Sequence, residues 1–288
     1  MTRRRAGPAG GHSEEPAPRP ALEATDIVLR DGSSVRIRPA AAADAPAILA
    51  FLRDLSPDGL WMRFAGYSGD LEGTARAWAR SPDHDTVSLL AVAGLEDRVV
   101  AQASYQRTGP EMAEVAFAVA DDHQGQGIAT QLLERLAGLA RDDGITIFEA
   151  QVVAHNHSML VVFRESGFPA TLSAEAGVVR VTMPTSLTEE GRARFERRAD
   201  IAAAAAVRQL LHPGSVAVVG ASRRRGTIGG EIFRALLDGD FQGPVYPINP
   251  AATVVQSVTA YPSVEDVPGP VDLAVIAVPA AAVAEAAG

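Results

Sequence analysis

The stretch Asp121–Thr130, DDHQGQGIAT, decides the fold of the first half of the chain, because it joins a strand-like apolar run to a leucine-rich run with helical spacing. Gly125 and Gly127 allow backbone angles that are closed to other residues and let the chain approach a ligand without a Cβ in the way. The free amides at the start of the next helix point into one small space, together with the positive end of the helix dipole. Such a turn favours a phosphate, although two glycines alone equally serve tight geometry.

The residues before this turn predict a hairpin, a helix and three strands. DIVLRDGSSVRIRPA reads as two short strands around Asp31-Gly32. Residues 43–55 have helical spacing, with Ile48, Phe51 and Leu52 on one face. Apolar runs at residues 87–93, 99–106 and 113–120 predict the strands.

The residues after the turn complete a first domain. A helical stripe of leucines ends at Asp142-Asp143-Gly144, and a strand at 145–153, a short helix ending at Gly167 and a strand at 178–183 follow. We therefore predict a mixed α+β domain over residues 25–185. Residues 1–24 are rich in Pro, Gly and Ala and are expected to form a disordered tail.

A different pattern begins at Ser186. Ser186 and Glu189 have the spacing of a capping box, which predicts a linker helix over residues 186–212. Strand, glycine turn, helix and strand then alternate from residue 213 onward, which is typical of a Rossmann-like, doubly wound parallel sheet. Because few strands precede Gly288, we expect this α/β domain (213–288) to be incomplete, and the chain to be the N-terminal part of a longer protein or a truncated reading frame.

The composition narrows the classes of function. The 288 residues carry a formal net charge of −9, which argues against nucleic acid as the main partner. With no cysteine, the chain has no disulfide, no thiolate metal site and no cysteine nucleophile. No apolar run reaches the roughly 18 residues of a membrane span. We expect a cytoplasmic protein that needs no metal.

The first turn resembles that of a known enzyme family. The residues from Gln124 to Ala129 read Q-x-x-G-x-A, and Asn156 and VFRESGF follow. This pattern is similar to the GNAT acyl-coenzyme A N-acyltransferases, and LSPDGLWMRF (55–64) resembles the acetyltransferase domain of Pat-type protein lysine acetyltransferases. The resemblance implies an acetyl-CoA site in which the turn holds the pyrophosphate and the end of the preceding strand holds the pantetheine. Its residues would be Phe117, Ala118, Val119, Gln124, Gly125, Gln126, Gly127, Ile128, Ala129 and Asn156.

Glu114 is the candidate catalytic base. A lysine amine, with a pKa near 10.4, must lose a proton before it attacks a thioester. Glu114 shares a strand face with alanines, where a carboxylate is costly to desolvate, and it matches the strand glutamate of the Pat-type enzymes. The alternative is a salt-bridged or edge-exposed glutamate on an ordinary strand. His123 is expected to be a partly exposed ring that packs at the strand end, and not a base. His155 and His157 are expected to be a solvated loop pair, and not metal ligands.

One position departs from the family pattern. Many GNAT enzymes carry a tyrosine seven residues after the asparagine, as the acid that protonates the leaving thiolate, whereas this chain has Phe163 there. Either water supplies that proton or the domain is catalytically inactive.

The second glycine turn, VVGASRRRGTIGG (218–230), has the same order of strand, glycine-rich turn and helix as the first. A nicotinamide site is the usual interpretation, but the next strand ends at Asn249 and not at the acidic residue that binds ribose. Three arginines crowd the turn and suit a ligand with additional phosphate, unless they form a solvated run.

Three blocks around this second turn resemble the coenzyme A-binding domain of NDP-forming acyl-CoA synthetases: LLHPGSVAVVGAS, VYPINP and AYPSVEDVPGPVDLAVIAVP. The resemblance implies CoA or acyl-CoA as the ligand and places eight residues at it. Gly220, Ala221, Ser222 and Arg223 would touch the phosphates, Asn249 and Pro250 the nucleotide, and Val278 and Pro279 the pantetheine. The family's catalytic histidine domain and its ATP-grasp domain are not in this sequence, so ligase activity is not expected.

Three hypotheses follow. The chain is an acetyl-CoA-dependent N-acetyltransferase of protein lysines, with acyl-CoA synthetases as possible acceptors, joined to a CoA-binding regulatory domain. Alternatively, it is a catalytically inactive module that senses acyl-CoA, or the N-terminal fragment of a fusion between a GNAT domain and an acyl-CoA synthetase. The role of Glu114 separates the first hypothesis from the second.

Overall fold

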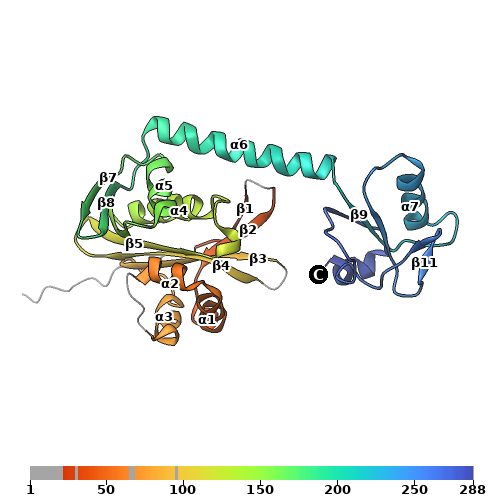
Figure 1. Cartoon of the computed structure of the whole chain (residues 1–288), viewed down its shortest axis with the longest axis horizontal. Helices are drawn as coiled ribbons and strands as arrows, with labels where there is room; N and C mark the ends of the chain where they lie inside the picture. The colour runs from red at the N-terminus through yellow and green to blue at the C-terminus, as the bar shows by residue number, and fades with distance from the viewer. Residues whose placement is uncertain (1–21, 30–31, 65–68, 95–96, 288) are drawn as a thin grey trace, which may run out of the picture.

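The computed structural model describes residues 22–29, 32–64, 69–94 and 97–287. It contains an eight-stranded sheet and a three-stranded sheet, and the long helix α6 (Glu189–Leu211) connects them (Figure 1). Residues 1–21 of the expected disordered tail lie outside the described residues.

The first sheet has the strand order β1-β2-β3-β4-β5-β6-β8-β7. Its strands are β1 (Thr25–Val28), β2 (Ser34–Pro39), β3 (Thr86–Ala93), β4 (Arg98–Arg107), β5 (Met112–Val119), β6 (Ile147–Val153), β7 (Thr171–Glu175) and β8 (Val178–Pro184). β1 and β2 pair antiparallel, as the hairpin signal predicts, although Asp31 of that turn lies outside the described residues.

Five helices cover the two faces of this sheet. They are α1 (Ala45–Asp54), α2 (Pro57–Phe64), α3 (Leu71–Trp78), α4 (Ile128–Asp142) and α5 (His157–Glu165), with short 3-10 turns at Ala42–Asp44 and Asp121–His123. Helices α1 to α3 lie on one face, and α4 and α5 lie on the other (Figure 1). The predicted apolar stripe of α1 is buried against the sheet, and that of α4 packs into the larger core on the opposite face.

The two central strands β5 and β6 separate along their length. Their parallel pairing covers only Met112–Glu114 against Ile147–Glu149, although β5 continues to Val119 and β6 to Val153. Beyond the last pair, the edge of β5 that faces β6 has no ladder partner among the described residues. Peptide groups without a partner need another hydrogen-bonding group, from water or from a ligand.

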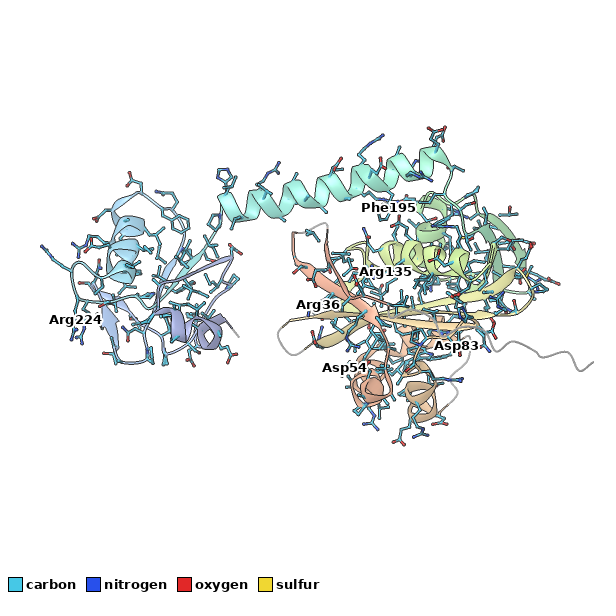
Figure 2. All side chains as sticks on the ribbon, turned by 180° about the vertical axis from the view of Figure 1, so that it is seen from behind. Arg36, Asp54, Asp83, Arg135, Phe195 and Arg224 are labelled. Carbon is cyan, nitrogen blue, oxygen red and sulfur yellow. The ribbon has the colours of Figure 1, made fainter. Side chains whose placement is uncertain are left out.

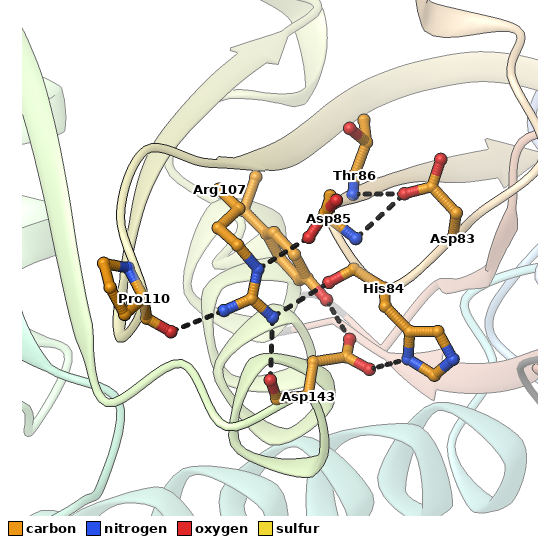
Figure 3. A network of polar contacts seen from close by, with 8 residues as sticks. Asp83, His84, Asp85, Thr86, Arg107, Pro110 and Asp143 are labelled. Atoms are coloured by element: carbon orange, nitrogen blue, oxygen red, sulfur yellow. Dashed lines mark hydrogen bonds and ion pairs between the residues drawn. The ribbon is translucent and has the colours of Figure 1, made fainter. Parts of the chain in front are cut away.

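A polar network fixes the end of α4 that lies farthest from the glycine turn (Figure 3). Asp143 accepts a hydrogen bond from the Tyr105 hydroxyl at 2.5 Å, and its other carboxylate oxygen lies 2.7 Å from His84 Nδ1. Arg107 donates to the carbonyl of Asp143 at 2.7 Å and to the Asp85 carboxylate at 2.7 Å. The network joins the C-terminus of α4 to β4 and to the loop before β3. It therefore fixes the end of α4 that is opposite the glycine turn.

Helix α6 begins later than its sequence predicts. Its N-cap is Thr188, whose hydroxyl accepts a hydrogen bond from Gly191 N at 3.0 Å, so the prediction of a Ser186 capping box is wrong. Leu187 packs against the core of the first unit, which keeps the chain extended past Ser186. A Cβ added to Gly167 would lie 2.8 Å from the Cα of Gly191, so the start of α6 rests directly on the turn after α5.

The second sheet is parallel, with the order β10-β9-β13, which confirms the doubly wound α/β prediction. Its elements are β9 (Val216–Val219), α7 (Ile228–Asp238), β10 (Val245–Ile248), β13 (Leu273–Ile276) and α8 (Val283–Ala287), with a small hairpin, β11 (Val254–Val255) and β12 (Val258–Thr259), and a 3-10 turn at Ala280–Ala282. A separate core that includes Val216, Val218 and Phe233 holds β9 against α7. Nowhere in the described parts of the chain is a helix both long enough and apolar enough to cross a membrane.

Candidate functional site

A cavity of about 480 Å³ opens where β5 separates from β6. Strand β5, helices α2, α4 and α5, the 3-10 turn before α4, and helix α6 contribute to its wall. The lining residues are Leu55, Gly59, Met62, Arg63, Phe117, Ala118, Val119, His123, Gln124, Gly125, Gly127, Ile128, Ala129, Thr130, Asn156, His157, Ser158, Met159, Val161, Val162, Glu165 and Arg198. Of the ten residues predicted for this coenzyme site, nine line the cavity; Gln126 is the exception.

The glycine turn leaves the start of α4 open toward this cavity. Gly125 and Gly127 have φ angles of 77° and 94°, the left-handed region that other residues rarely adopt. Gly127 is the N-cap of α4 and has no side chain to accept from the first amides of the helix. The positive end of the α4 dipole is therefore free to take an anion from the cavity.

Asp121 ties the turn to the segment before α2. Its carboxylate accepts a hydrogen bond from Ser56 N at 2.9 Å and lies 3.2 Å from Gln124 Nε2. The Gln126 side chain packs inward, and its buried Oε1 has no hydrogen-bond partner in the described structure. The SPDG segment that carries the Pat-like resemblance thus holds the glycine turn in position from across the sheet.

Strand β5 and helix α5 form the apolar sides of the cavity. Phe117 on β5 is 8% exposed, and Phe163 on α5 is fully buried with its ring edge-on to Phe117, at 6.0 Å between centroids. Asn156 is the N-cap of α5, because its Oδ1 accepts from Met159 N at 3.0 Å. The cap explains why an asparagine stands here structurally, and Asn156 is also part of the cavity wall.

The surroundings of Glu114 differ from the sequence-based expectation. The Glu114 side chain is exposed, so the expected desolvation among alanines is wrong. Helix α2 covers the adjoining positions of this strand face, whereas Glu114 lies at the last β5 position that is paired with β6, opposite Glu149. Glu114 is not in the cavity wall, but Phe117, three residues further along the strand, is.

Arg63 on α2 adds a cation that sequence reasoning missed. Its guanidinium lies 5.1 Å from the centroid of the Phe64 ring and 5.0 Å from that of Trp78, and it lines the cavity. Burial lowers the pKa of Arg63 to about 10, and the nearby negative charge of Glu114 opposes this change. Arg63 therefore stays positively charged at neutral pH and brings its charge close to the candidate base.

The three histidines lie at partly or fully exposed positions, as the sequence predicts, and two of them border the cavity. His123 and His157 both line the cavity, and His123 Nδ1 lies 2.7 Å from the Asp122 carboxylate. His155 instead packs edge-on to Trp61, at 5.9 Å between ring centroids. No three His, Asp or Glu residues in the described ranges are grouped closely enough to hold a metal ion.

The second glycine turn is packed more tightly than the first. Gly220 has a φ of 88°, and a Cβ there would lie 2.6 Å from the carbonyl oxygen of Ala277 and 3.0 Å from Val278 Cγ1. Asn249 Nδ2 donates to the carbonyl of Ala221 at 2.7 Å. The structure thus brings together Gly220, Ala221, Asn249 and Val278, as the sequence predicts for one site.

The remaining predicted residues of this second site lie around it on the surface. Arg223, Pro250 and Pro279 are exposed, and Ser222 Oγ accepts from Arg224 N at 3.1 Å. Arg224 is also exposed, and it lies at the edge of the second unit that faces away from the first unit (Figure 2). Arg223, Arg224 and Arg225 form no ion pair with any residue that the structure describes, so their charge is available at the surface of the turn.

Comparison with known families matches both halves of the chain. The sequence model of the acetyltransferase (GNAT) family matches residues 47–168, and that of a CoA-binding domain matches residues 214–288. The first match contains the first glycine turn and every lining residue of the cavity except Arg198, and the second match contains the second turn.

Individual relatives also match one half of the chain or the other. Acetyltransferase Pat of Mycolicibacterium smegmatis is 28% identical over 143 residues, which is 49% of this chain and 43% of that protein. The ADP-forming acetate–CoA ligase II of Archaeoglobus fulgidus is 47% identical over 79 residues, 27% of this chain and 12% of the ligase. Among solved structures, the GNAT domain of S. lividans PAT is 34% identical, covering 56% of this chain and 96% of that one, with a TM-score of 0.49.

The chain therefore spans less than half of the acetyltransferase Pat and about one-eighth of the ligase that it matches. The likeness to ligases lies in the CoA-binding half alone, since the match covers 79 residues.

Proposed function

Since the chain carries a GNAT acetyltransferase domain followed by a CoA-binding domain, we propose that it transfers an acetyl group from acetyl-CoA to the amine of a protein lysine. We assign the acetyltransferase unit to residues 25–185 and the CoA-binding unit to residues 213–288. The observation that carries the proposal is the cavity that joins an uncapped helix start to the unpaired edge of β5.

These two features suit the two chemically different halves of coenzyme A. The pyrophosphate would lie at the amides of the glycine turn, where each favourable contact with the helix dipole contributes on the order of 0.3–1 kcal/mol. The pantetheine amides would pair with the free edge of β5 at Phe117, Ala118 and Val119. The thioester would then point toward the earlier residues of β5, in the direction of Glu114.

The chemistry requires a base for the acceptor. In this account the Glu114 carboxylate takes a proton from the lysine ammonium, directly or through one water, and the neutral amine attacks the thioester carbonyl carbon. A C–N bond forms, the C–S bond breaks, the coenzyme leaves as a thiolate, and the new amide nitrogen releases its second proton to solvent water. Glu114 is close enough to Arg63 for its negative charge to act on the pKa of Arg63, and an exposed carboxylate is accessible to a lysine on another protein.

The thiolate must be protonated by a group other than residue 163. Phe163 has no proton to give, and its ring is fully buried against Phe117. Solvent water supplies the proton in this account, because a thiol pKa, about 8.5 for cysteine, is low enough for the thiolate to leave without a side-chain acid. Direct transfer in a ternary complex agrees with the absence of cysteine from the sequence.

The CoA-binding unit would take CoA or acyl-CoA at its own glycine turn and regulate the first unit. Its likeness to ADP-forming ligases also suggests acyl-CoA synthetases as acceptors, because both proteins would then act on the same pool of coenzyme.

The test is acetyl transfer from labelled acetyl-CoA to a lysine-bearing acyl-CoA synthetase, with the native chain, Glu114→Gln and Glu149→Gln. Glu149 is the neighbour of Glu114 across the strands and therefore the matched control. We expect Glu114→Gln to lower turnover by roughly 10²–10⁴-fold, the contribution of a general base, and Glu149→Gln to leave turnover nearly unchanged. Equal rates for all three proteins would remove Glu114 from the mechanism.

Phe163 favours one second candidate, an acyl-CoA-sensing module without catalysis. Under that hypothesis the native chain binds acetyl-CoA in the first cavity but transfers no label to any lysine acceptor.

A further inference from the structure

Arg63, near the end of α2, is the charged residue that this helix contributes to the cavity wall. The other wall residues from the same segment are Leu55, Gly59 and Met62, which carry no charge. A ligand group that meets this segment in the cavity therefore meets apolar surface and one cation.

The direction of α2 places Arg63 toward the acyl end of the proposed coenzyme site. The helix begins beside the glycine turn, because Ser56 N donates to the Asp121 carboxylate at 2.9 Å and a Cβ on Gly59 would lie 3.7 Å from the same carboxylate. Arg63 is about one helical turn beyond Gly59, and the negative charge of Glu114 acts on its pKa. Helix α2 thus leads from the pyrophosphate end of the site toward Glu114.

Two aromatic rings hold the Arg63 side chain at the wall. The guanidinium lies close to the rings of Phe64 and Trp78, which stack on each other with 6.0 Å between their centroids. The Nε atom of Arg63 is buried without a hydrogen-bond partner, and no carboxylate of the described residues forms an ion pair with this guanidinium. Burial without such pairing is costly for a cation, so a bound anion would stabilise Arg63.

Glu114 leaves Arg63 able to bind a second carboxylate. The Glu114 side chain is exposed, so water and salt screen its charge. A guanidinium also has several N–H donors, of which one carboxylate uses only a pair. Arg63 is therefore suited to hold a carboxylate of the ligand while Glu114 acts as the base.

The chemistry of acyl-CoA identifies where this ligand anion would come from. In the proposed site the pyrophosphate lies at the glycine turn, at the other end of the cavity. The pantetheine arm is uncharged, and an acetyl group offers Arg63 no negative charge. An acyl group that ends in a second carboxylate does offer one, and the planar guanidinium matches a carboxylate with two parallel hydrogen bonds.

We propose that Arg63 binds the terminal carboxylate of a dicarboxylic acyl-CoA such as succinyl-CoA, so that the first unit transfers carboxylate-ended acyl groups in addition to acetyl. This assignment rests on the proposed coenzyme site and lysine transfer. The bond changes are those of acetyl transfer: a C–N bond forms at the thioester carbonyl carbon, the C–S bond breaks, and the terminal carboxylate is unchanged. The acceptor lysine would become negatively charged, whereas acetylation only neutralises it.

The test compares succinyl-CoA with butyryl-CoA, whose acyl chain has the same number of carbons but ends in a methyl group. Both tryptophans of the chain, Trp61 and Trp78, belong to the first unit, so tryptophan fluorescence of the full chain reports its cavity and not the second CoA site. The proteins are the native chain, Arg63→Met, and the matched control Arg76→Met, which removes an exposed arginine from the neighbouring helix α3.

We expect the native chain to bind succinyl-CoA more tightly than butyryl-CoA. Arg63→Met should weaken succinyl-CoA binding by about 10- to 100-fold, the effect of losing a hydrogen-bonded charge pair, and change butyryl-CoA binding by less than about twofold. Retained butyryl-CoA binding also shows that the variant is folded. Arg76→Met should bind both ligands like the native chain.

Three results would overturn the assignment. A native chain that binds succinyl-CoA no more tightly than butyryl-CoA would exclude the carboxylate contact. An equal loss for both ligands in Arg63→Met would mean that Arg63 acts on the fold or on the part of the ligand that both share. No loss for either ligand would remove Arg63 from the site.

Failure of the proposed function gives different results. A native chain that binds neither ligand in the first cavity would contradict the coenzyme site, and the Arg63 assignment with it. The expected binding pattern without transfer of labelled acyl groups to a lysine acceptor would contradict the proposed activity but support the Arg63 contact.

Discussion

The two glycine turns have the same strand–turn–helix order, but their glycines serve different purposes. At the first turn, a Cβ on Gly125 would meet nothing within 4 Å, so glycine is needed there for its backbone angle. At the second turn, a Cβ on Gly229 would overlap the carbonyl of Gly220, so glycine is needed for close packing between α7 and β9. One turn leaves space for a ligand beside the backbone, and the other uses the same residue type to bring two pieces of backbone together.

The largest effect is expected from Gly229→Ala. The added Cβ would lie within 2.7 Å of the Gly220 carbonyl carbon, and backbone cannot move away as a flexible side chain can. We expect the free energy of unfolding of the second unit to fall by about 3 kcal/mol or more. Hydrogen exchange should show lost protection in β9 and α7, with the tryptophan-monitored unfolding of the first unit unchanged. If the amides of β9 kept their native protection in this variant, the second turn would accept an added Cβ as readily as the first.

Gly125→Ala should affect binding more than stability. Alanine at a φ of 77° costs about 1–2 kcal/mol, and relaxation of the turn would misplace the amides that face the cavity. We expect coenzyme A binding, followed by tryptophan fluorescence, to weaken by about tenfold.

The matched control for this change is Gly144→Ala at the other end of α4. Gly144 has a φ of 75° and the same open surroundings, so it should lose similar stability and keep its affinity. A loss of affinity in Gly144→Ala as large as that in Gly125→Ala would mean that strain in α4, and not the turn, controls binding.

The asparagine of each unit offers a further comparison. Asn156 caps α5 through its Oδ1 atom, whereas Asn249 also donates through Nδ2 to Ala221. Asn156→Asp keeps a good N-cap, so stability should change by less than about 0.5 kcal/mol, but its added charge at the cavity should weaken coenzyme A binding. Asn249→Asp loses a hydrogen bond and should destabilise the second unit by about 1 kcal/mol. Urea unfolding of both variants, with coenzyme titrations, distinguishes capping from ligand contact.

The smallest effect concerns Glu134, on the helix that follows the first turn. Burial raises its pKa from 4.5 to about 7, so the folded state holds its proton at pH values where the unfolded chain has lost it. Ionisation of the partly buried Glu134 carboxylate lowers the free energy of unfolding. This loss is absent below pH 4.5, grows as the pH rises toward 7 and is constant above that. Because the side chain is partly solvated, we expect at most about 1 kcal/mol.

Glu134→Gln should therefore stabilise the first unit more at high pH than at low pH, as measured by tryptophan-monitored unfolding. The control is Glu111→Gln, at an exposed position on the loop before β5. It measures how the loss of one carboxylate changes stability when that carboxylate is not buried. A stabilisation that is equal at both ends of the pH range would contradict the effect of burial.

Most of the first fold was predictable because its elements carry local signals. The helix stripes and the strands up to β6 follow from apolar periodicity, and the turn follows from its glycines. The first residue of α6 was not predictable from the sequence. Ser186 and Thr188 can both cap a helix, and the packing of Leu187 against the core decides between them.

The candidate site was predictable only where its residues belong to the turn and its flanking elements. Arg63 and Arg198 reach the cavity from helices that are distant in sequence, and nothing local marks either arginine as part of the cavity wall. The exposure of Glu114 depends on where β6 leaves β5 and on which positions α2 covers, and a strand pattern does not contain that information.

The measurement that tests this account most directly is hydrogen exchange of the full chain with and without acetyl-CoA, because it reports both turns in one sample. We predict increased protection at the amides of residues 115–119 and 125–130, which are the free edge of β5 and the start of α4. Protection confined to residues 220–230, or no protection in either region, would contradict the claim that the first turn and the separated strands form the acyl-CoA site.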